Sequence, residues 1–206
     1  DFPNEGWIKN RIFQKNINYA ELLASTSNCM AKQLKRVMDN ENLEIEITPF
    51  GVDTEVFNPE LFSDGEGEEI VIGNIKILEP KYGIDVFIDS ISILMARLKK
   101  RHLDNIASSI KVKIYGEGKQ RQELIQKTKD LNLDGVVQFC GRVPNTEVPH
   151  CLAEFTIFCA TSVLDSESFG VAVVEAMAMK VPVVTSDADG FCEVVSDGET
   201  GMIVPK

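Results

Sequence analysis

The sequence predicts an α/β fold built on a doubly wound parallel sheet, and two observations carry this prediction. From residue 70 to the end of the chain, short apolar runs of strand type alternate with segments of helical spacing. The first of those helical segments has apolar residues at Ile84, Phe87, Ile88 and Ile91, the spacing of a helix with one buried face. Strands that alternate with helices imply right-handed crossovers and a parallel sheet covered on both sides.

The individual elements follow from the same patterns. We expect helices over 7–20 and 27–39 around a short strand in 22–26, and another short strand over 43–48. Residues 49–69 contain Pro, Gly and Asn and an acidic run, which indicates a linker between a piece of one domain, 1–48, and a second domain, 70–206. In the second domain, strands are expected at 70–75, 111–115, 136–139, 155–160, 182–186 and 202–204. Helices are expected near 83–99, 119–131, 146–153, 169–179 and 191–196.

The composition excludes several kinds of function. A net charge of −11 argues against binding to a nucleic-acid backbone, and the short basic run 99–101 is interpreted as charges at a helix end. There is no apolar stretch of membrane-spanning length and no signal-peptide pattern, so a soluble, cytoplasmic protein is expected. The five cysteines and the histidines His102 and His150 lack the spacing of zinc ligands, so reduced thiols and no metal are expected. Asp187 and Asp189 are interpreted as part of a turn rather than as metal ligands.

The most informative residue is Glu175, a lone carboxylate in the apolar run from Phe169 to Met179. A buried ionised carboxylate costs several kcal/mol unless a partner stabilises its charge. If a helix begins near Phe169, its free N–H groups can hold a phosphate, and Glu175 lies roughly 5–8 Å further along the axis. That offset suits a carboxylate that accepts hydrogen bonds from a ribose diol, and Glu167 would then face the group attached to the phosphate. The alternative is an ion pair between Glu175 and a core Arg or Lys.

Three other loops after strands carry candidate residues, because ligands of such sheets bind beyond the carboxyl ends of the strands. Lys76 and Lys81 follow the first strand and either hold an anion or are simply solvated. Gly116 belongs to a G-x-G turn, which allows a close approach of backbone to a ligand. As a dinucleotide fingerprint this turn is weak, because Arg121 stands where a third glycine is needed. Arg142 follows the third strand, and its alternatives are a ligand contact and a surface ion pair.

Several ordered motifs resemble the retaining glycosyltransferases of the GT-B fold, family 4. They are S-T-S-N-C-M-A-K-Q-L at 25–34, P-F-G-V-D-T-E-V-F-N-P at 49–59, L-E-P-K-Y-G-I-D at 78–85, G-R-V-P at 141–144, E-S-F-G-x-x-x-x-E-A-M-A from Glu167, V-P-V-V-T-S from Val181 and D-G-E-T-G-x-x-V-P from Asp197. The resemblance covers the chain from about Glu21 to Lys206.

This resemblance implies that 70–206 is a Rossmann-like domain that binds a nucleotide-sugar donor, the C-terminal half of a GT-B glycosyltransferase. Residues 1–48 would be the tail of the N-terminal domain, which binds the acceptor across a cleft. Because the chain starts without Met and stops directly after a strand, we expect a fragment without its last helices. Such a fragment would bind donors and transfer nothing. A peripheral membrane contact is expected only of the full-length protein.

The resemblance also implies roles for individual residues. Glu167 would hold hydroxyls of the donor sugar, Glu175 the ribose, and Lys81 the phosphates. Lys76 stands where many members have the arginine of a G-R-L run, and it lacks the arginine's fork of donors. The turn Asp189–Gly190 replaces the family's usual G-G beside the donor sugar, so donor preference can depend on it. The remaining donor contacts are expected at Ser168, Phe169, Gly170, Val171, Gly73, Gly116, Arg142 and Val143.

The expected function is transfer of a sugar, with retention, from a nucleotide diphosphate sugar to a carbohydrate or lipid-linked acceptor, as in polysaccharide biosynthesis. The leaving diphosphate gains negative charge, which two lysines and a helix N-terminus can stabilise without a metal or a cofactor. In this family the departing phosphate oxygen is thought to take the acceptor's proton. The alternatives are a non-catalytic nucleotide-sugar binding module and a GT-B sugar-nucleotide epimerase or phosphorylase.

Overall fold

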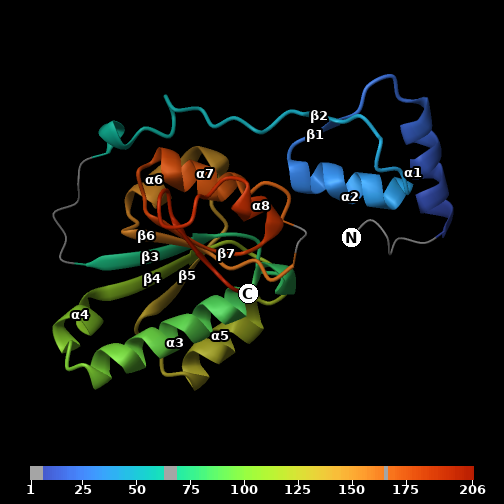
Figure 1. The fold of residues 1–206 in the computed structure, drawn as a ribbon. Coiled ribbons are helices and arrows are strands. Elements are labelled where there is room, and N and C mark those ends of the chain that lie inside the picture. Colours follow the sequence, from blue (N-terminus) through green and yellow to red (C-terminus); the bar gives the residue numbers. More distant parts are fainter. Residues whose placement is uncertain (1–6, 63–68, 165–166) are drawn as a thin grey trace.

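A six-stranded parallel sheet forms the body of the protein (Figure 1). This computed structural model describes residues 7–62, 69–164 and 167–206. The strands are β3 (Ile70–Ile75), β4 (Ile110–Tyr115), β5 (Val137–Gly141), β6 (Ile157–Ala160), β7 (Val183–Ser186) and β8 (Met202–Val204). Each pairing between neighbours is parallel, in the order β5-β4-β3-β6-β7-β8. The predicted Rossmann-like α/β class is therefore confirmed.

The strand order reverses next to β3, and this reversal positions the site. The chain enters the sheet at β3, proceeds outward to β5, and returns to β6 on the other side of β3. At the return, Ile72 pairs with Ile157 and Gly73 with Phe158. Loops that leave β3 and β6 diverge to opposite faces, and a crevice opens between them at the carboxyl ends.

Helices cover both faces of this sheet (Figure 1). One face carries α3 (Ile84–Lys100) and α5 (Arg121–Asp130), and the other carries α6 (Val148–Ala153), α7 (Val171–Ala178) and α8 (Asp189–Cys192). The neighbouring strand residues Val71 and Ile72 belong to two different buried clusters, the first with α6 and α7 and the second with α3 and α5. Successive side chains of β3 thus point to opposite cores, which explains why the strand is apolar throughout.

The N-terminal part is a smaller unit that lies beyond α8 (Figure 1). It contains α1 (Trp7–Tyr19), β1 (Ala24–Ser25), α2 (Asn28–Met38) and β2 (Glu46–Ile47), and β1 pairs with β2 in parallel. It contacts the large sheet domain through the start of α2. There the carboxylate of Glu193 accepts hydrogen bonds from the backbone N–H of Asn28 at 2.8 Å and from that of Cys29. Where one domain ends and the next begins, at residues 48 and 70, stays a prediction.

Most predicted elements are present, several with ends shifted by one to three residues, and three differences are informative. The helix predicted from residue 169 begins at Val171, because Gly170 adopts a left-handed conformation with φ 82° and ends the preceding loop. The helix predicted at 191–196 is the four-residue α8, which begins earlier, at Asp189. Helix α4 (Asp104–Ser109) was not predicted, since its six residues are too few for a periodic pattern. The single-turn helices are η2 (Pro59–Leu61), η3 (Pro80–Tyr82) and η4 (Asn145–Glu147).

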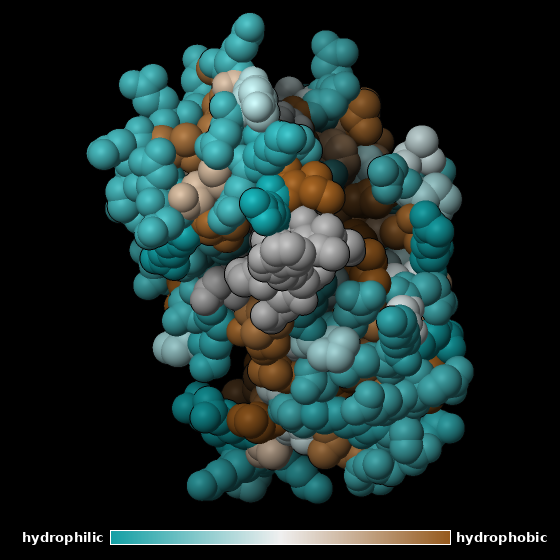
Figure 2. Space-filling view, turned by 90° about the vertical axis from the view of Figure 1, so that its right-hand side faces the viewer, coloured by the Kyte–Doolittle hydropathy of each residue, from teal (hydrophilic) through white to brown (hydrophobic). Residues whose placement is uncertain are grey.

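The face of the molecule shown in Figure 2 is mostly hydrophilic, with local apolar patches. Figure 2 looks at the side that carries α1 and α2, and hydrophobic areas interrupt the hydrophilic surface there. In the N-terminal unit, Tyr19 and Leu22 are 79% and 69% exposed. None of the helices within the described ranges combines the length and hydropathy that a membrane crossing requires.

Candidate functional site

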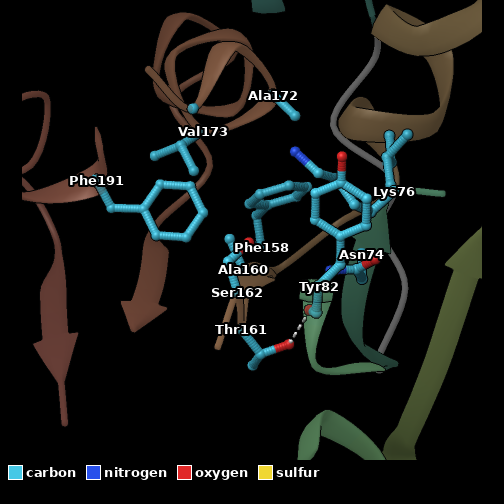
Figure 3. Close-up of a pocket in the computed structure, with 12 residues that line it drawn as sticks. Asn74, Lys76, Tyr82, Phe158, Ala160, Thr161, Ser162, Ala172, Val173 and Phe191 are labelled. Atoms are coloured by element: carbon cyan, nitrogen blue, oxygen red, sulfur yellow. Dashed lines mark hydrogen bonds between the residues drawn. The ribbon is translucent and has the colours of Figure 1, made fainter. Parts of the chain in front are cut away.

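A small pocket lies at the strand-order reversal, between the loops that follow β3 and β6 and the start of α7 (Figure 3). Its polar lining comes from Asn74, Lys76, Tyr82, Thr161 and Ser162. Apolar residues of β6, α7 and α8 close the other side, among them Phe158, Val173 and Phe191. The site thus forms where the sheet topology predicts a ligand.

Glu167 is held inside the protein by two partners. Lys76 Nζ donates to Glu167 Oε2 at 2.8 Å, and Ser162 Oγ donates to the same oxygen at 3.1 Å. The Glu167 side chain is 8% exposed and the Lys76 side chain 26%. The ammonium and the hydroxyl compensate the cost of taking this carboxylate out of water. Two of the predicted catalytic residues, 91 positions apart in the chain, therefore form one ion pair.

Both predicted phosphate-binding lysines lie against the same aromatic ring. Lys76 Nζ is 4.4 Å from the centroid of the Tyr82 ring, and Lys81 Nζ is 4.9 Å from it. A ring face attracts a cation electrostatically at such distances. Two positive charges are thus gathered at the carboxyl end of the central strand, where an anion would bind.

The turn that carries Lys81 is attached to the loop after β6. Pro80 begins the single-turn helix η3, and Gly83 ends it with φ 62°. The hydroxyl of Thr161 donates to the Gly83 carbonyl at 2.9 Å, and the backbone N–H of Val163 donates to the Lys81 carbonyl at 3.0 Å. A Cβ on residue 83 would lie 2.1 Å from the Thr161 carbonyl oxygen, so only glycine permits this contact.

The start of α7 lines the pocket through Gly170, Ala172 and Val173. The N–H groups of Val173 and Val174 donate to the Gly170 carbonyl, which leaves the amides ahead of them without an intrahelical partner. A Cβ on residue 170 would lie 2.7 Å from the Phe191 ring, so the close packing of α8 requires this glycine. Phe169 is buried and packs edge-on against Phe50, with ring centroids 5.8 Å apart. In the described part of the chain the amides of Gly170 to Ala172 have no hydrogen-bond partner, and contact of the predicted segment from Ser168 to Val171 with a phosphate stays a prediction.

Glu175 lies in the second turn of α7 and is partly buried. Within the described ranges, its carboxylate has no hydrogen bond and no ion pair, so the alternative of a core Arg or Lys partner finds no support there. Burial raises the pKa of this carboxyl above its ordinary value. It lies one turn beyond Ala172 and Val173, which line the pocket. The charge that the sequence marked as unpaired is therefore also unpaired among the residues that the structure describes.

The predicted glycines serve close packing. A Cβ on Gly73 would lie 2.1 Å from the Phe155 ring, and a Cβ on Gly116, whose φ is 141°, would lie 1.8 Å from the Lys76 carbonyl oxygen. Gly116 therefore lets the end of β4 approach the loop that carries Lys76. Contact of either glycine with a donor stays a prediction.

Arg142 and Val143 lie outside the lining of the pocket. They follow β5, which is separated from β3 by β4. Arg142 is exposed, and Val143 packs partly buried against the core. In the described part of the chain Arg142 forms no ion pair, so the surface-pair alternative is not supported, and its donor contact stays a prediction.

The turn predicted for the D-x-D pattern is wrong, because Asp189 and Gly190 are the first residues of α8 and neither has a positive φ. Asp187 precedes that helix and accepts a hydrogen bond from the backbone N–H of Lys206 at 3.0 Å. A Cβ on Gly190 would lie 2.3 Å from the Glu167 carbonyl oxygen, so the start of α8 packs directly on the loop of the ion pair. Among the residues that the structure describes, no three His, Cys, Asp or Glu side chains gather as metal ligands. A metal-free reaction stays a prediction.

Four polar residues of the pocket were not singled out as site residues from the sequence: Asn74, Tyr82, Thr161 and Ser162. Asn74 is 2% exposed and donates through Nδ2 to the Cys159 carbonyl at 2.7 Å, while its Oδ1 has no partner among the described residues. A polar residue inside the apolar run of β3 was the signal that marks it. Tyr82 stands directly after Lys81, but no local pattern indicates that its ring reaches both lysines.

Known proteins resemble this chain in sequence. The family model for glycosyl transferases group 1 matches residues 59–206. A phosphatidyl-myo-inositol mannosyltransferase of Mycolicibacterium smegmatis is 32% identical over 161 residues, which are 76% of this chain and 38% of that protein. A D-inositol 3-phosphate glycosyltransferase of Nocardioides sp. is 28% identical over 205 residues, 91% of this chain and 43% of that protein. The chain thus spans about two fifths of the length of these curated relatives.

Solved structures resemble it in fold. HepE of Anabaena, in complex with UDP and glucose, superposes on 100% of this chain and 55% of its own with a TM-score of 0.79 at 20% identity. The C-terminal domain of the group 1 glycosyl transferase LpcC from Francisella tularensis covers 75% of this chain and 80% of its own, with a TM-score of 0.57 at 27% identity. The sheet domain described above is therefore a fold found in GT-B glycosyltransferases.

Proposed function

Because this chain belongs to the glycosyl transferases group 1 family, we propose that residues 70–206 bind the nucleotide-sugar donor of a retaining glycosyltransferase. The observation that carries the proposal is the unpaired carboxylate of Glu175, one turn inside a helix whose start lines the pocket of Lys76. The lysines follow β3, the amides open α7, and the carboxylate of Glu175 lies one turn further along α7. A nucleoside diphosphate offers the matching series of phosphate and ribose hydroxyls.

The donor would contact the lysines, the amides and Glu175 in turn. Its diphosphate would take the free amides at the start of α7 and the ammonium groups of Lys76 and Lys81, both of which favour a negative charge. The ribose hydroxyls would donate to Glu175, and that partner would compensate the burial that raises the pKa of the carboxyl. The transferred sugar would lie near Glu167, whose Oε2 already has two donors.

Charge development gives these residues a role in the reaction. When the bond between sugar and phosphate breaks, the leaving diphosphate gains negative charge next to Lys76, Lys81 and the start of α7. In a retaining transfer by front-side attack, the acceptor hydroxyl forms the new bond to the sugar on the same face, and its proton moves to the departing phosphate oxygen. Such a route needs no protein base and no metal ion, because the fixed cations stabilise the charge.

The acceptor belongs to the proposal for the whole protein. Curated relatives are named as mannosyltransferases of phosphatidyl-myo-inositol and as a glycosyltransferase of D-inositol 3-phosphate. A carbohydrate or lipid-linked acceptor, bound across the cleft by an N-terminal domain in the cytoplasm, fits both. The 206 residues alone are expected to bind a donor without transferring its sugar.

A thermal-shift panel tests the proposal. We expect UDP, GDP or one of their sugars, at about 100 times its Kd, to stabilise the chain by about 2.7 kcal/mol, which is several degrees in Tm. NAD and ATP serve as controls, since neither offers a terminal sugar or a bare diphosphate end. A shift with NAD alone, or with none of the diphosphates, would contradict a nucleotide-sugar site. In the full-length protein, release of nucleoside diphosphate only with acceptor present would separate a transferase from a binding module and an epimerase.

A further inference from the structure

Tyr82 is placed to act on both phosphate-binding lysines at once. It is the last residue of η3, and in the chain it follows Lys81 directly and Lys76 by six positions. Figure 3 shows its ring standing in the pocket beside Lys76, with the apolar wall of Val173 and Phe191 on the opposite side. A bulky aromatic side chain thus occupies the space between the two loops that frame the pocket.

The ring contacts both ammonium groups. Lys76 Nζ and Lys81 Nζ lie 4.4 Å and 4.9 Å from its centroid, within the range of about 6 Å in which a ring face attracts a cation. A lysine has a long, flexible stem, and two ammonium groups repel each other. Without the ring, Lys81 would be free to move into solvent, and Lys76 would be held by its ion pair with Glu167 alone.

The backbone under the ring is fixed from the other side of the pocket. Thr161 Oγ1 lies 3.3 Å from the Tyr82 carbonyl and 2.9 Å from that of Gly83, and Val163 N–H donates to the Lys81 carbonyl (Figure 3). Thr161 is followed by Ser162, which donates to Glu167. The turn, the ring and the carboxylate are therefore parts of one connected unit. The position of the ring depends on the same loop that holds Glu167.

We propose that Tyr82 is a positioning residue whose ring holds Lys76 and Lys81 together for the diphosphate of the donor. The inference rests on the proposed function, and it adds a residue that touches no reacting atom. The aromatic ring and not the hydroxyl would position the lysines, because both cations lie near the ring centroid. Phenylalanine at this position should therefore hold the two lysines as tyrosine does, and leucine should not.

Calorimetry with UDP and GDP tests the proposal on the 206-residue chain. We expect Tyr82→Phe to bind as the wild type does and Tyr82→Leu to bind about tenfold more weakly, since two cation contacts are lost. Tyr19→Leu is the matched control, because Tyr19 is a 79% exposed tyrosine on α1. Wild-type affinity in Tyr82→Leu would overturn the proposal, and so would an equal loss in Tyr82→Phe and Tyr82→Leu.

A second measurement does not depend on a ligand. After reductive ¹³C-methylation, which keeps the lysine charge, the methyl resonances of Lys76 and Lys81 should be shifted by the ring current in the wild type and in Tyr82→Phe. In Tyr82→Leu they should return to the position of exposed lysines. Single Lys76→Arg and Lys81→Arg variants assign the two signals, and unshifted signals in the folded wild type would contradict the proposal.

The two measurements separate this inference from the proposed function. If the wild type binds neither diphosphate, the donor site fails, whatever the lysine resonances show. If the wild type binds and the resonances are shifted but Tyr82→Leu loses no affinity, the donor site stands and the role of Tyr82 fails.

Discussion

Glu167 and Glu175 are eight residues apart on one loop-helix unit, yet they differ in whether the fold supplies a partner for the carboxylate. Glu167 is 8% exposed and is held by Lys76 at 2.8 Å and Ser162 at 3.1 Å. Glu175 is partly buried, and in the described part of the chain nothing pairs with it. One carboxylate is satisfied from within the fold, and the other has no partner in the described part of the chain.

This difference indicates which of the two carboxylates would gain more electrostatic stabilisation from the proposed donor. At Glu167, a sugar hydroxyl would join a network that is already neutral, so it would add specificity more than stability. At Glu175, a ribose would remove a desolvation cost that the free protein bears. The nucleotide end should therefore supply more of the binding free energy than the sugar end does.

Loss of Lys76 should have the largest effect on stability. Lys76→Ala leaves the carboxylate of Glu167 buried without an opposite charge, and we expect a decrease of about 2 kcal/mol in the free energy of unfolding. The matched control is Lys113→Ala, which removes a partly exposed ion pair with Glu154 and should cost below about 1 kcal/mol. Urea unfolding of both variants measures the two values. Equal losses would contradict the prediction that the buried pair of Lys76 and Glu167 contributes more to stability than the exposed pair of Lys113 and Glu154.

Glu193 extends the comparison to a third carboxylate, one that is exposed but partnered. Its partial burial acts to raise the pKa, but hydrogen bonds from Asn28 and Cys29 outweigh this and lower the pKa of the Glu193 carboxyl. The contact therefore stabilises the fold above the pKa of the unfolded state, and this stabilisation is lost as pH falls through the folded pKa. Glu193→Gln should cost about 1 kcal/mol at neutral pH, as the loss of a helix cap does.

Hydrogen exchange at the start of α2 checks this prediction. The Asn28 and Cys29 amides should exchange faster in Glu193→Gln than in the control Glu199→Gln, whose glutamate is exposed. Unchanged exchange would show that Glu193 does not hold the N-terminal unit to the sheet domain.

Replacing Glu175 should change stability in the opposite direction. Glu175→Gln removes an unpaired, partly buried charge and should stabilise the free protein by up to about 1 kcal/mol, reduced by solvent screening. Because burial raises the pKa of this carboxyl above 4.5, it stabilises the folded state below that value, and this contribution is lost as pH rises through the folded pKa. Urea unfolding from about pH 4 to about pH 7 should show this slope in the wild type and not in Glu175→Gln. A less stable variant at neutral pH would indicate a partner for Glu175.

The fold and half of the site were predictable from local sequence. Short apolar runs located strands such as β3, because its successive residues face two buried cores, and helical spacing located α3, because one of its faces is buried. The lone charge of Glu175 in an apolar helix was likewise a local signal. The start of α7 was placed two residues early, because the left-handed conformation of Gly170 depends on the packing of Phe191 against it.

The rest of the site depends on contacts between distant segments. The pair of Lys76 and Glu167 joins residues 91 positions apart, and Glu193 meets Asn28 across 165 positions. The contact of Tyr82 with two lysines follows from where η3 is tied to the loop after β6. No periodicity or spacing encodes such pairings, since they arise only when the sheet brings the loops together.

Calorimetry of the wild type, Glu175→Gln and the control Glu123→Gln with UDP and GDP tests the central claim most directly. Glu123 is an exposed glutamate on α5, on the opposite face of the sheet. If Glu175 binds the ribose of the donor, Glu175→Gln should weaken binding of the preferred diphosphate by about 10- to 100-fold, because a charged acceptor is lost. Glu123→Gln should bind as the wild type does. Equal affinities in all three proteins would contradict the assignment of Glu175 to the nucleotide.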